Sequence, residues 1–147
     1  MRRALLLVLL AAGACVRLDF GRRVSDDELR LRRELEGYYL DAAAAFAAAS
    51  PEALAALYDP AITRPMTREK IREWGVEFFG KHGPARFKVE KLEFDRLGYQ
   101  DAVVTLTYRV ETRDGEGSFG GVEQDEFVKK GGRWLMTGWE KVPARSK

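Results

Sequence analysis

The chain has 147 residues, of which 46% are hydrophobic and 33% are charged, enough for one domain with a packed core. Its 25 Lys and Arg residues nearly balance its 23 Asp and Glu residues, so there is little long-range attraction to phosphate backbones and we expect no nucleic-acid partner. One cysteine excludes an intrachain disulfide, and one cysteine with one histidine argues against a transition-metal site. We expect no metal and no cofactor.

The N-terminal segment has the three parts of a secretory signal peptide. Two arginines, Arg2 and Arg3, precede an apolar run, and the run ends in four small residues before Cys15. The uncharged stretch 4–14 is too short for a helix that crosses a bilayer, which needs roughly 20 apolar residues. We therefore expect residues 1–14 to be a signal peptide.

The end of this segment, Ala12-Gly13-Ala14-Cys15, resembles the lipobox of bacterial lipoproteins, although leucine is usual where Ala12 stands. The resemblance implies that Cys15 becomes N-terminal and carries lipid. Several acyl chains on Cys15 would anchor the protein stably, since a single chain holds only marginally. It also implies a place in the bacterial cell envelope, on the periplasmic side of the inner or outer membrane. Without residues 1–14 the chain would hold 23 basic and 23 acidic residues.

A short charged stretch and a long helix follow the cysteine. Residues 15–26 lack apolar periodicity and are predicted to be a tether to a single domain over 27–147. From Asp26 the sequence DDELRLRRELEGYYLDAAAAFAAAS predicts a helix, because apolar residues recur at helical spacing. These residues are Leu31, Leu35, Tyr38 or Tyr39, Ala42 and Phe46.

Two shorter helices are predicted next. Ser50 can cap a helix that begins at Pro51, and Asp59-Pro60 ends it. Thr67 can cap a third helix in REKIREWGVEFFG, which places Ile71, Trp74 and Phe78 on one face.

After Pro84 the period becomes that of strands. RFKVEKLEFD alternates but changes phase between Val89 and Leu92, which predicts a bulge. Three further strands are predicted in DAVVTLTYRVETR, SFGGVEQDEFVKK and RWLMTGWEKV, joined by glycine-containing turns. The segment 115–120 fits the dinucleotide-binding pattern G-x-G-x-x-G, but strands flank it on both sides, so we interpret it as a hairpin. Helices followed by an antiparallel meander predict an α+β fold.

The order of these elements, with LYDPAI, REKIREWGVEFF and the hairpin FVKKGGRWLMTGW, resembles the nuclear transport factor 2-like superfamily. That superfamily includes the SnoaL-like polyketide cyclases and the ketosteroid isomerases. The resemblance covers about residues 28–142 and implies a cone of three N-terminal helices packed on a curved antiparallel sheet. The candidate pocket residues that it implies are Tyr39, Trp74, Phe78, Tyr108, Gln124 and Trp139.

The resemblance also suggests what chemistry to test. Isomerases of this type use a tyrosine of the first helix to hold an enolate oxygen, a role open to Tyr39 or Tyr38. They place a carboxylate base shortly after the second helix, where this chain has Arg64 or Pro65. Arginine stays protonated and cannot accept a proton, which disfavours isomerase chemistry. Arg64 could instead bind a ligand carboxylate or phosphate, or form a surface ion pair. His82 lies in GKHGP after the third helix and is expected to be exposed and structural.

The last strand suggests a second copy of the chain as a partner. By simple alternation Trp134 and Met136 point to one face of the sheet, and Leu135 and Trp139 point to the other. Apolar residues on both faces predict that the outer face is covered, and we expect a homodimer there.

Taken together, the sequence favours a lipid-anchored envelope protein whose domain binds a small apolar ligand or a protein partner without catalysis. The alternative is a small SnoaL-like enzyme, a cyclase or dehydratase that uses Tyr39 and polar pocket groups. A purely structural dimerisation module is a third possibility. Titratable groups buried in the cone would favour the enzyme, a dry apolar cone would favour binding, and a cone filled by its own aromatic side chains would favour the structural role.

Overall fold

The computed structural model describes residues 23–143. The signal peptide, Cys15 and most of the tether therefore lie outside the described residues. The elements are α1 (Asp26–Ala47), α2 (Pro51–Ala55), α3 (Arg68–His82), β1 (Ala85–Leu97), β2 (Asp101–Thr112), β3 (Phe119–Lys130) and β4 (Arg133–Lys141). Over the range 23–143, no helix has the length and apolar character needed to span a membrane.

Each helix begins at a hydroxyl residue that caps it. The Ser50 hydroxyl accepts a hydrogen bond from the Ala53 amide at 3.1 Å, and the Thr67 hydroxyl accepts one from the Lys70 amide at 3.3 Å. Both predicted caps are thus confirmed. Ser25 caps α1 in the same way, and three acidic residues in the first turn of α1 complement the positive end of its dipole.

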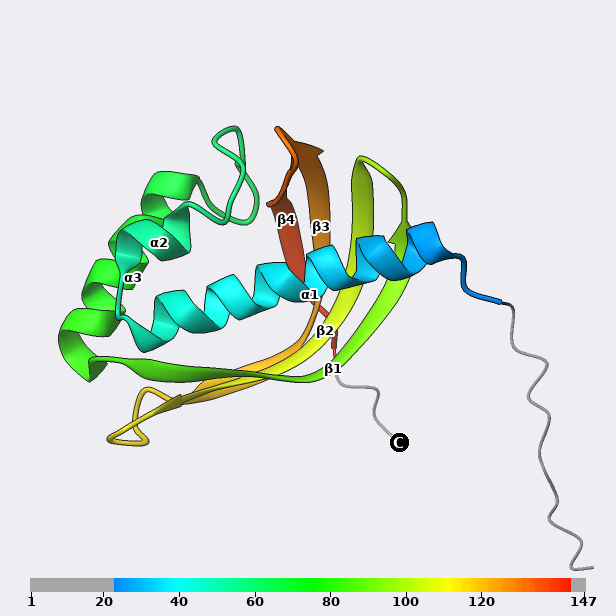
Figure 1. Cartoon of the computed structure of the whole chain (residues 1–147). Coiled ribbons are helices and arrows are strands. Elements are labelled where there is room, and N and C mark those ends of the chain that lie inside the picture. The colour runs from blue at the N-terminus through cyan, green and yellow to red at the C-terminus, as the bar shows by residue number, and fades with distance from the viewer. Residues whose placement is uncertain (1–22, 144–147) are drawn as a thin grey trace, which may run out of the picture.

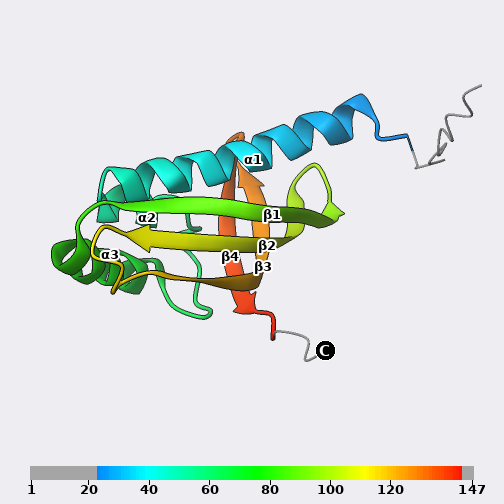
Figure 2. The same ribbon diagram turned by 90° about the horizontal axis from the view of Figure 1, so that it is seen from below.

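The four strands form one antiparallel sheet in the order β1-β2-β3-β4. The sheet curves, and α1 lies along its concave side, with α2 and α3 together at one end (Figure 1). Figure 2 shows β1 beside α1, and this pair makes the main contact of α1 with the sheet. Helix α1 contributes the fully buried side chain of Leu35 and the ring of Phe46 to the core.

Two bulges in β1 keep its apolar side chains on the concave face. The pairing register shifts between Val89 and Lys91, which confirms the predicted bulge, and shifts again between Phe94 and Arg96. Because each shift resets the alternation, Leu92 and Phe94 after the first bulge and Leu97 after the second all pack against the core.

A bulge in β4 has a larger consequence. Phe127 pairs with Met136 and Glu126 pairs with Gly138, so Thr137 is an extra residue on β4. The extra residue reverses the alternation, and Trp139 then faces the concave side just as Met136 does. The prediction that Trp139 points outward with Leu135 was wrong, since it assumed an unbroken period of two.

The outer face of the sheet is mainly polar. It carries exposed or half-exposed ion pairs, such as Lys88 with Glu111 at 2.8 Å and Lys91 with Glu93 at 2.9 Å. The inward turn of Trp139 removes the main apolar residue that had suggested a covered outer face. A homodimer through this face stays a prediction, and the face offers less apolar surface for it than the sequence suggested.

The segment after α2 is tied to β4. The Asp59 amide donates to the Met136 carbonyl at 2.9 Å, and the Met136 amide donates to the Leu57 carbonyl at 3.0 Å. The Asp59 carboxylate, 2% exposed, pairs with the Lys130 ammonium at 2.5 Å. These contacts bring Tyr58 beside Trp139, with ring centroids 5.4 Å apart.

Candidate functional site

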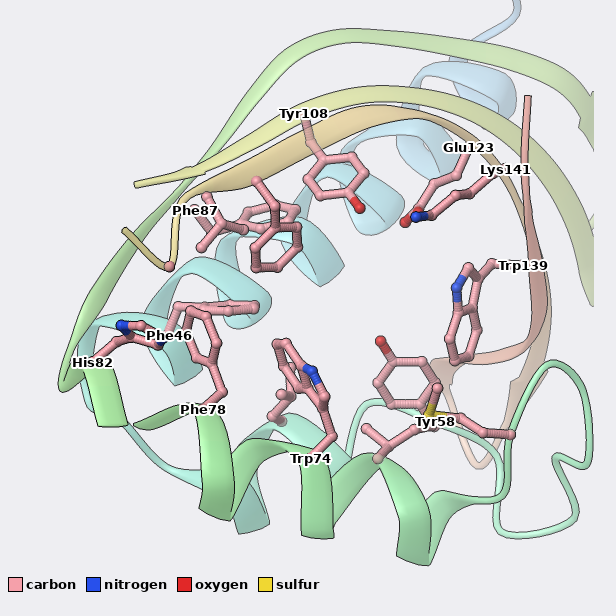
Figure 3. Close-up of a pocket in the computed structure, with 16 residues that line it drawn as sticks. Phe46, Tyr58, Trp74, Phe78, His82, Phe87, Tyr108, Glu123, Trp139 and Lys141 are labelled. Carbon is pink, nitrogen blue, oxygen red and sulfur yellow. The ribbon is translucent and has the colours of Figure 1, made fainter. Parts of the chain in front are cut away.

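A cavity of about 450 Å³ lies between α3, the segment around Tyr58 and the concave face of the sheet (Figure 3). Ile71, Trp74 and Phe78 all line it, so the face of the third helix that the sequence predicted is the one that faces the cavity. The volume is within the range of small-molecule sites.

One half of the cavity is aromatic. Trp74 stacks on Phe78 with centroids 4.8 Å apart and rings inclined by 16°, and Phe46 stacks on Phe87 at 5.6 Å and 19°. These flat surfaces suit an apolar or ring-bearing molecule. Trp74 is 36% exposed and thus also meets solvent.

The other half is polar. Here Tyr58, Tyr108, Glu123, Trp139 and Lys141 line the wall, and Figure 3 shows the two tyrosine hydroxyls and the Glu123 carboxylate directed toward one space. The β4 bulge is what places the last two residues there, because it pairs Trp139 with Asp125 and Lys141 with Glu123 on the concave side.

Behind this polar half, two carboxyl groups lie close together on β3. Glu123 and Asp125 are two positions apart and share the concave face with Phe127. Asp125 is fully buried, and its Oδ2 accepts a 2.6 Å hydrogen bond from the Tyr39 hydroxyl. Its Oδ1 has no hydrogen-bond partner among residues 23–143. A carboxyl in this position is costly to ionise.

The surroundings change the acidity of both groups. Burial, and then the neighbouring Glu123 carboxylate, raise the pKa of Asp125 well above its ordinary value. Burial also raises the pKa of Glu123, against the opposing effects of the Tyr108 hydroxyl and the Lys141 ammonium. The neutral form is thus favoured for both carboxyl groups, more strongly for Asp125, and Glu123 is the one of the pair that lines the cavity.

The tyrosines at this end stay protonated. Burial raises the pKa of Tyr58, and burial followed by the charge of Glu123 raises the pKa of Tyr108. Both hydroxyls can donate a hydrogen bond to a ligand oxygen, while Glu123 can accept or return a proton. Within the described part of the chain, no three His, Cys, Asp or Glu side chains gather as a metal-binding group.

His82 lies at the aromatic end of the cavity. The sequence predicted an exposed loop residue, but His82 is the last residue of α3 and its side chain is only 9% exposed. Its Nδ1 lies 2.9 Å from Oδ2 of Asp114, in the hairpin between β2 and β3. The prediction was wrong because the ring folds back under this hairpin, a contact that local sequence does not show.

Of the pocket residues predicted from the resemblance, Trp74, Phe78, Tyr108 and Trp139 line the cavity. Tyr39 does not line it, but reaches the polar end through Asp125.

Two predicted residues do not belong to the cavity wall. Gln124 turns to the outer face, where its amide donates to the Asp95 carboxylate at 3.4 Å. Arg64 is exposed in the loop between α2 and α3. Glu123 was missed in favour of Gln124, although counting by twos from the apolar Phe127 would have placed Glu123 and Asp125 inward.

Neither a known family nor a curated protein matches this sequence. Solved structures do match it. Rv3472 from Mycobacterium tuberculosis, a protein of unknown function, aligns with a TM-score of 0.68 and 14% identity over 82% of this chain and 76% of its own. A candidate scytalone dehydratase from Novosphingobium aromaticivorans aligns with a TM-score of 0.66 and 18% identity over 82% and 93%.

Bd1075 from Bdellovibrio bacteriovorus aligns with a TM-score of 0.67 and 15% identity over 82% of this chain. The aligned region spans only 45% of Bd1075, less than half of that protein. A Nostoc punctiforme protein with a TM-score of 0.62 is described as having a cystatin-like fold. At these identities the likeness shows the fold alone, and the predicted α+β cone of the nuclear transport factor 2-like type is confirmed.

Proposed function

We propose that the cavity binds a small molecule with an apolar, ring-bearing body and a hydrogen-bonding group at one end. The observation that carries this proposal is the division of one cavity into a stacked aromatic half and a half where two hydroxyls, a carboxylate and an ammonium converge. An apolar body would displace water from the rings, and the polar groups would fix its orientation.

The binding test uses para-phenylphenol, a two-ring body with one hydroxyl. Because Trp74 and Trp139 both line the cavity, we expect saturable quenching of tryptophan fluorescence. Met66→Phe adds volume at the wall and should weaken binding about tenfold, an effect of the size expected from overpacking. Val76→Phe, on the exposed side of α3, is the matched control and should leave binding unchanged. Absence of saturable binding would contradict the proposal.

An acid–base enzyme is the second candidate, and the Glu123–Asp125 pair favours it over a non-catalytic binder. Burial raises the pKa of Glu123, which favours proton exchange by this carboxyl group. The Tyr58 and Tyr108 hydroxyls could stabilise charge that develops on a ligand oxygen. Dehydration and cyclisation, the SnoaL-like alternatives, both need a group that removes a proton and returns it.

Glu123→Gln keeps the shape of the side chain and removes its acid–base capacity. We would incubate the wild-type protein and this variant with a metabolite extract of the host and follow substrate loss by mass spectrometry. An enzyme should lose about 100-fold or more of its turnover while para-phenylphenol binding persists. Glu126→Gln, three positions along β3 and exposed, is the matched control. Equal turnover in all three proteins would exclude this role for Glu123.

Attachment to the cell envelope through lipid on Cys15 is also proposed, on the support of the leader pattern alone. Protein extracted from host membranes in mild detergent should have a mass that lacks residues 1–14 and includes acyl chains. Cys15→Ser should release the protein from the membrane fraction. A mass that still includes residues 1–14 would contradict the anchor. The same native mass spectrum would test the expected homodimer.

A further inference from the structure

His82 and Glu123 both line the cavity and lie toward its two ends. Figure 3 shows His82 beside Phe46 and Phe78, while Glu123 and Lys141 lie across the open space. The His82 ring contacts Phe78, with centroids 5.2 Å apart. The aromatic half of the cavity wall therefore includes one polar ring, that of His82.

Asp114 fixes which nitrogen of His82 carries a proton. Oδ1 of Asp114 accepts hydrogen bonds from the Thr112 hydroxyl at 2.7 Å and from the Glu116 amide at 3.1 Å. These bonds hold the carboxylate in place, and the His82 and Thr112 contacts lower the pKa of Asp114 well below its usual range. Because Oδ2 can only accept, Nδ1 of His82 is the donor at 2.9 Å.

The other ring nitrogen is left for a ligand. Nε2 makes no hydrogen bond to any residue in the range 23–143. In the neutral ring with Nδ1 protonated, Nε2 is an acceptor, and in the charged ring it is a donor. It can therefore bond to a hydroxyl in either state.

Gly117 shows that the hairpin is shaped around this ring. A Cβ placed on Gly117 would lie 2.6 Å from two carbons of the His82 ring, closer than side chains tolerate. Glycine at this position lets the hairpin backbone lie flat against the imidazole. The ring is thus held on one side by the hairpin and on the other by Phe78.

We infer that His82 is a second ligand-contacting position, and that the preferred ligand carries a hydrogen-bonding hydroxyl at each end of its ring-bearing body. This inference rests on the proposed binding function. Glu123 and the two tyrosines contact one hydroxyl, and Nε2 of His82 contacts the other. The substrate class is then a flat molecule that is polar at both ends and apolar between them.

The test compares two probes with the same two-ring body. Para-phenylphenol has a hydroxyl at one end, and para,para-biphenol has one at both ends. The wild-type protein should bind biphenol more tightly by about fivefold, the value of one added hydrogen bond. His82→Phe should remove the difference between the affinities for the two probes, whereas Glu123→Gln should leave that difference in place.

A measurement on the wild-type protein guards against misfolding of the variant. His82 is the only histidine, so its ring nitrogens give a unique pair of nitrogen-15 NMR signals. The Nδ1–H tautomer should be present, and biphenol but not para-phenylphenol should shift the Nε2 signal. Equal affinities for both probes with an unmoved Nε2 signal would overturn the inference and leave the proposed function standing. Binding of neither probe would overturn both.

Discussion

The Tyr39 hydroxyl donates a 2.6 Å hydrogen bond to Oδ2 of Asp125, and this bond joins α1 to β3 inside the core. The two residues are 86 positions apart in sequence. Because Asp125 lies next to Glu123 on the same face of β3, the first helix holds the carboxyl group that sits behind the cavity. Packing of the domain and acidity of the site are therefore linked through one contact.

Loss of this hydroxyl should cost stability. Tyr39→Phe removes the partner of Oδ2 and leaves a buried carboxyl oxygen unsatisfied, so we expect the free energy of unfolding to fall by about 1–3 kcal/mol. Tyr38→Phe is the matched control, because Tyr38 is equally buried and its hydroxyl makes no hydrogen bond within residues 23–143. Urea denaturation checks both variants, and equal losses would argue against the role of the Tyr39 bond.

The raised pKa of Asp125 predicts a pH-dependent stability. The unfolded carboxyl ionises near about pH 4, so above that pH the folded state keeps a proton that the unfolded state has released. The contribution of Asp125 is thus fully present at low pH and is lost as pH rises toward its folded pKa. Asp125→Asn should gain stability relative to the wild-type protein as the pH rises above about pH 4. A flat difference in urea denaturation would show that Asp125 ionises normally.

The contribution of Asp59 to the free energy of unfolding should depend on pH in the opposite sense. The Lys130 ammonium and the Ala61 amide lower the pKa of Asp59, so its contribution is present above the unfolded pKa and is lost in acid. Lys130→Met should reduce the free energy of unfolding near neutral pH by about 1–2 kcal/mol, and by less in acid. Lys91→Met breaks an exposed pair with Glu93 and should cost about 0.5 kcal/mol or less. Thermal melts at two pH values would distinguish the pairs.

Gly117→Ala should displace the His82 ring. The added methyl group would overlap the ring, and we expect a loss of about 1–3 kcal/mol together with altered imidazole NMR signals. Gly121→Ala, four residues further along in β3 and with open space around its Cβ position, should leave the imidazole signals unchanged. If both variants behave alike, the ring does not depend on the missing side chain of Gly117.

Most of the fold could be predicted from local patterns. The caps at Ser50 and Thr67, the face of α3 and the first bulge of β1 each follow from a few neighbouring residues, and each is confirmed. The segment 115–120 also forms a hairpin, as its flanking strands predicted, with 115–118 in the turn between β2 and β3 and the last two residues in β3.

The site was harder to predict because its residues are polar and come from distant elements. Composition does not mark Asp125 as buried, since VEQDEF is as polar as an exposed strand, and only the alternation counted from Phe127 places Asp125 inward. The partner that makes its burial tolerable, Tyr39, is supplied by α1. His82 likewise becomes part of the cavity only through Asp114 and Gly117, some 30 residues further along.

Thr137, the extra residue in β4, changes which positions of the strand face the core. Up to Met136, even-numbered positions face the core, and beyond Thr137 the odd-numbered positions do. Deleting Thr137 would remove the bulge and leave Trp139 paired with Asp125 and Lys141 paired with Glu123, both still on the concave face. A strand that kept Thr137 but paired with β3 without a bulge would instead place Gly138 and Glu140 on the cavity wall. Among chains of this architecture, the presence or absence of the bulge therefore decides which β4 residues line the cavity, and cavity residues can be compared position by position only after the pairing with β3 is matched.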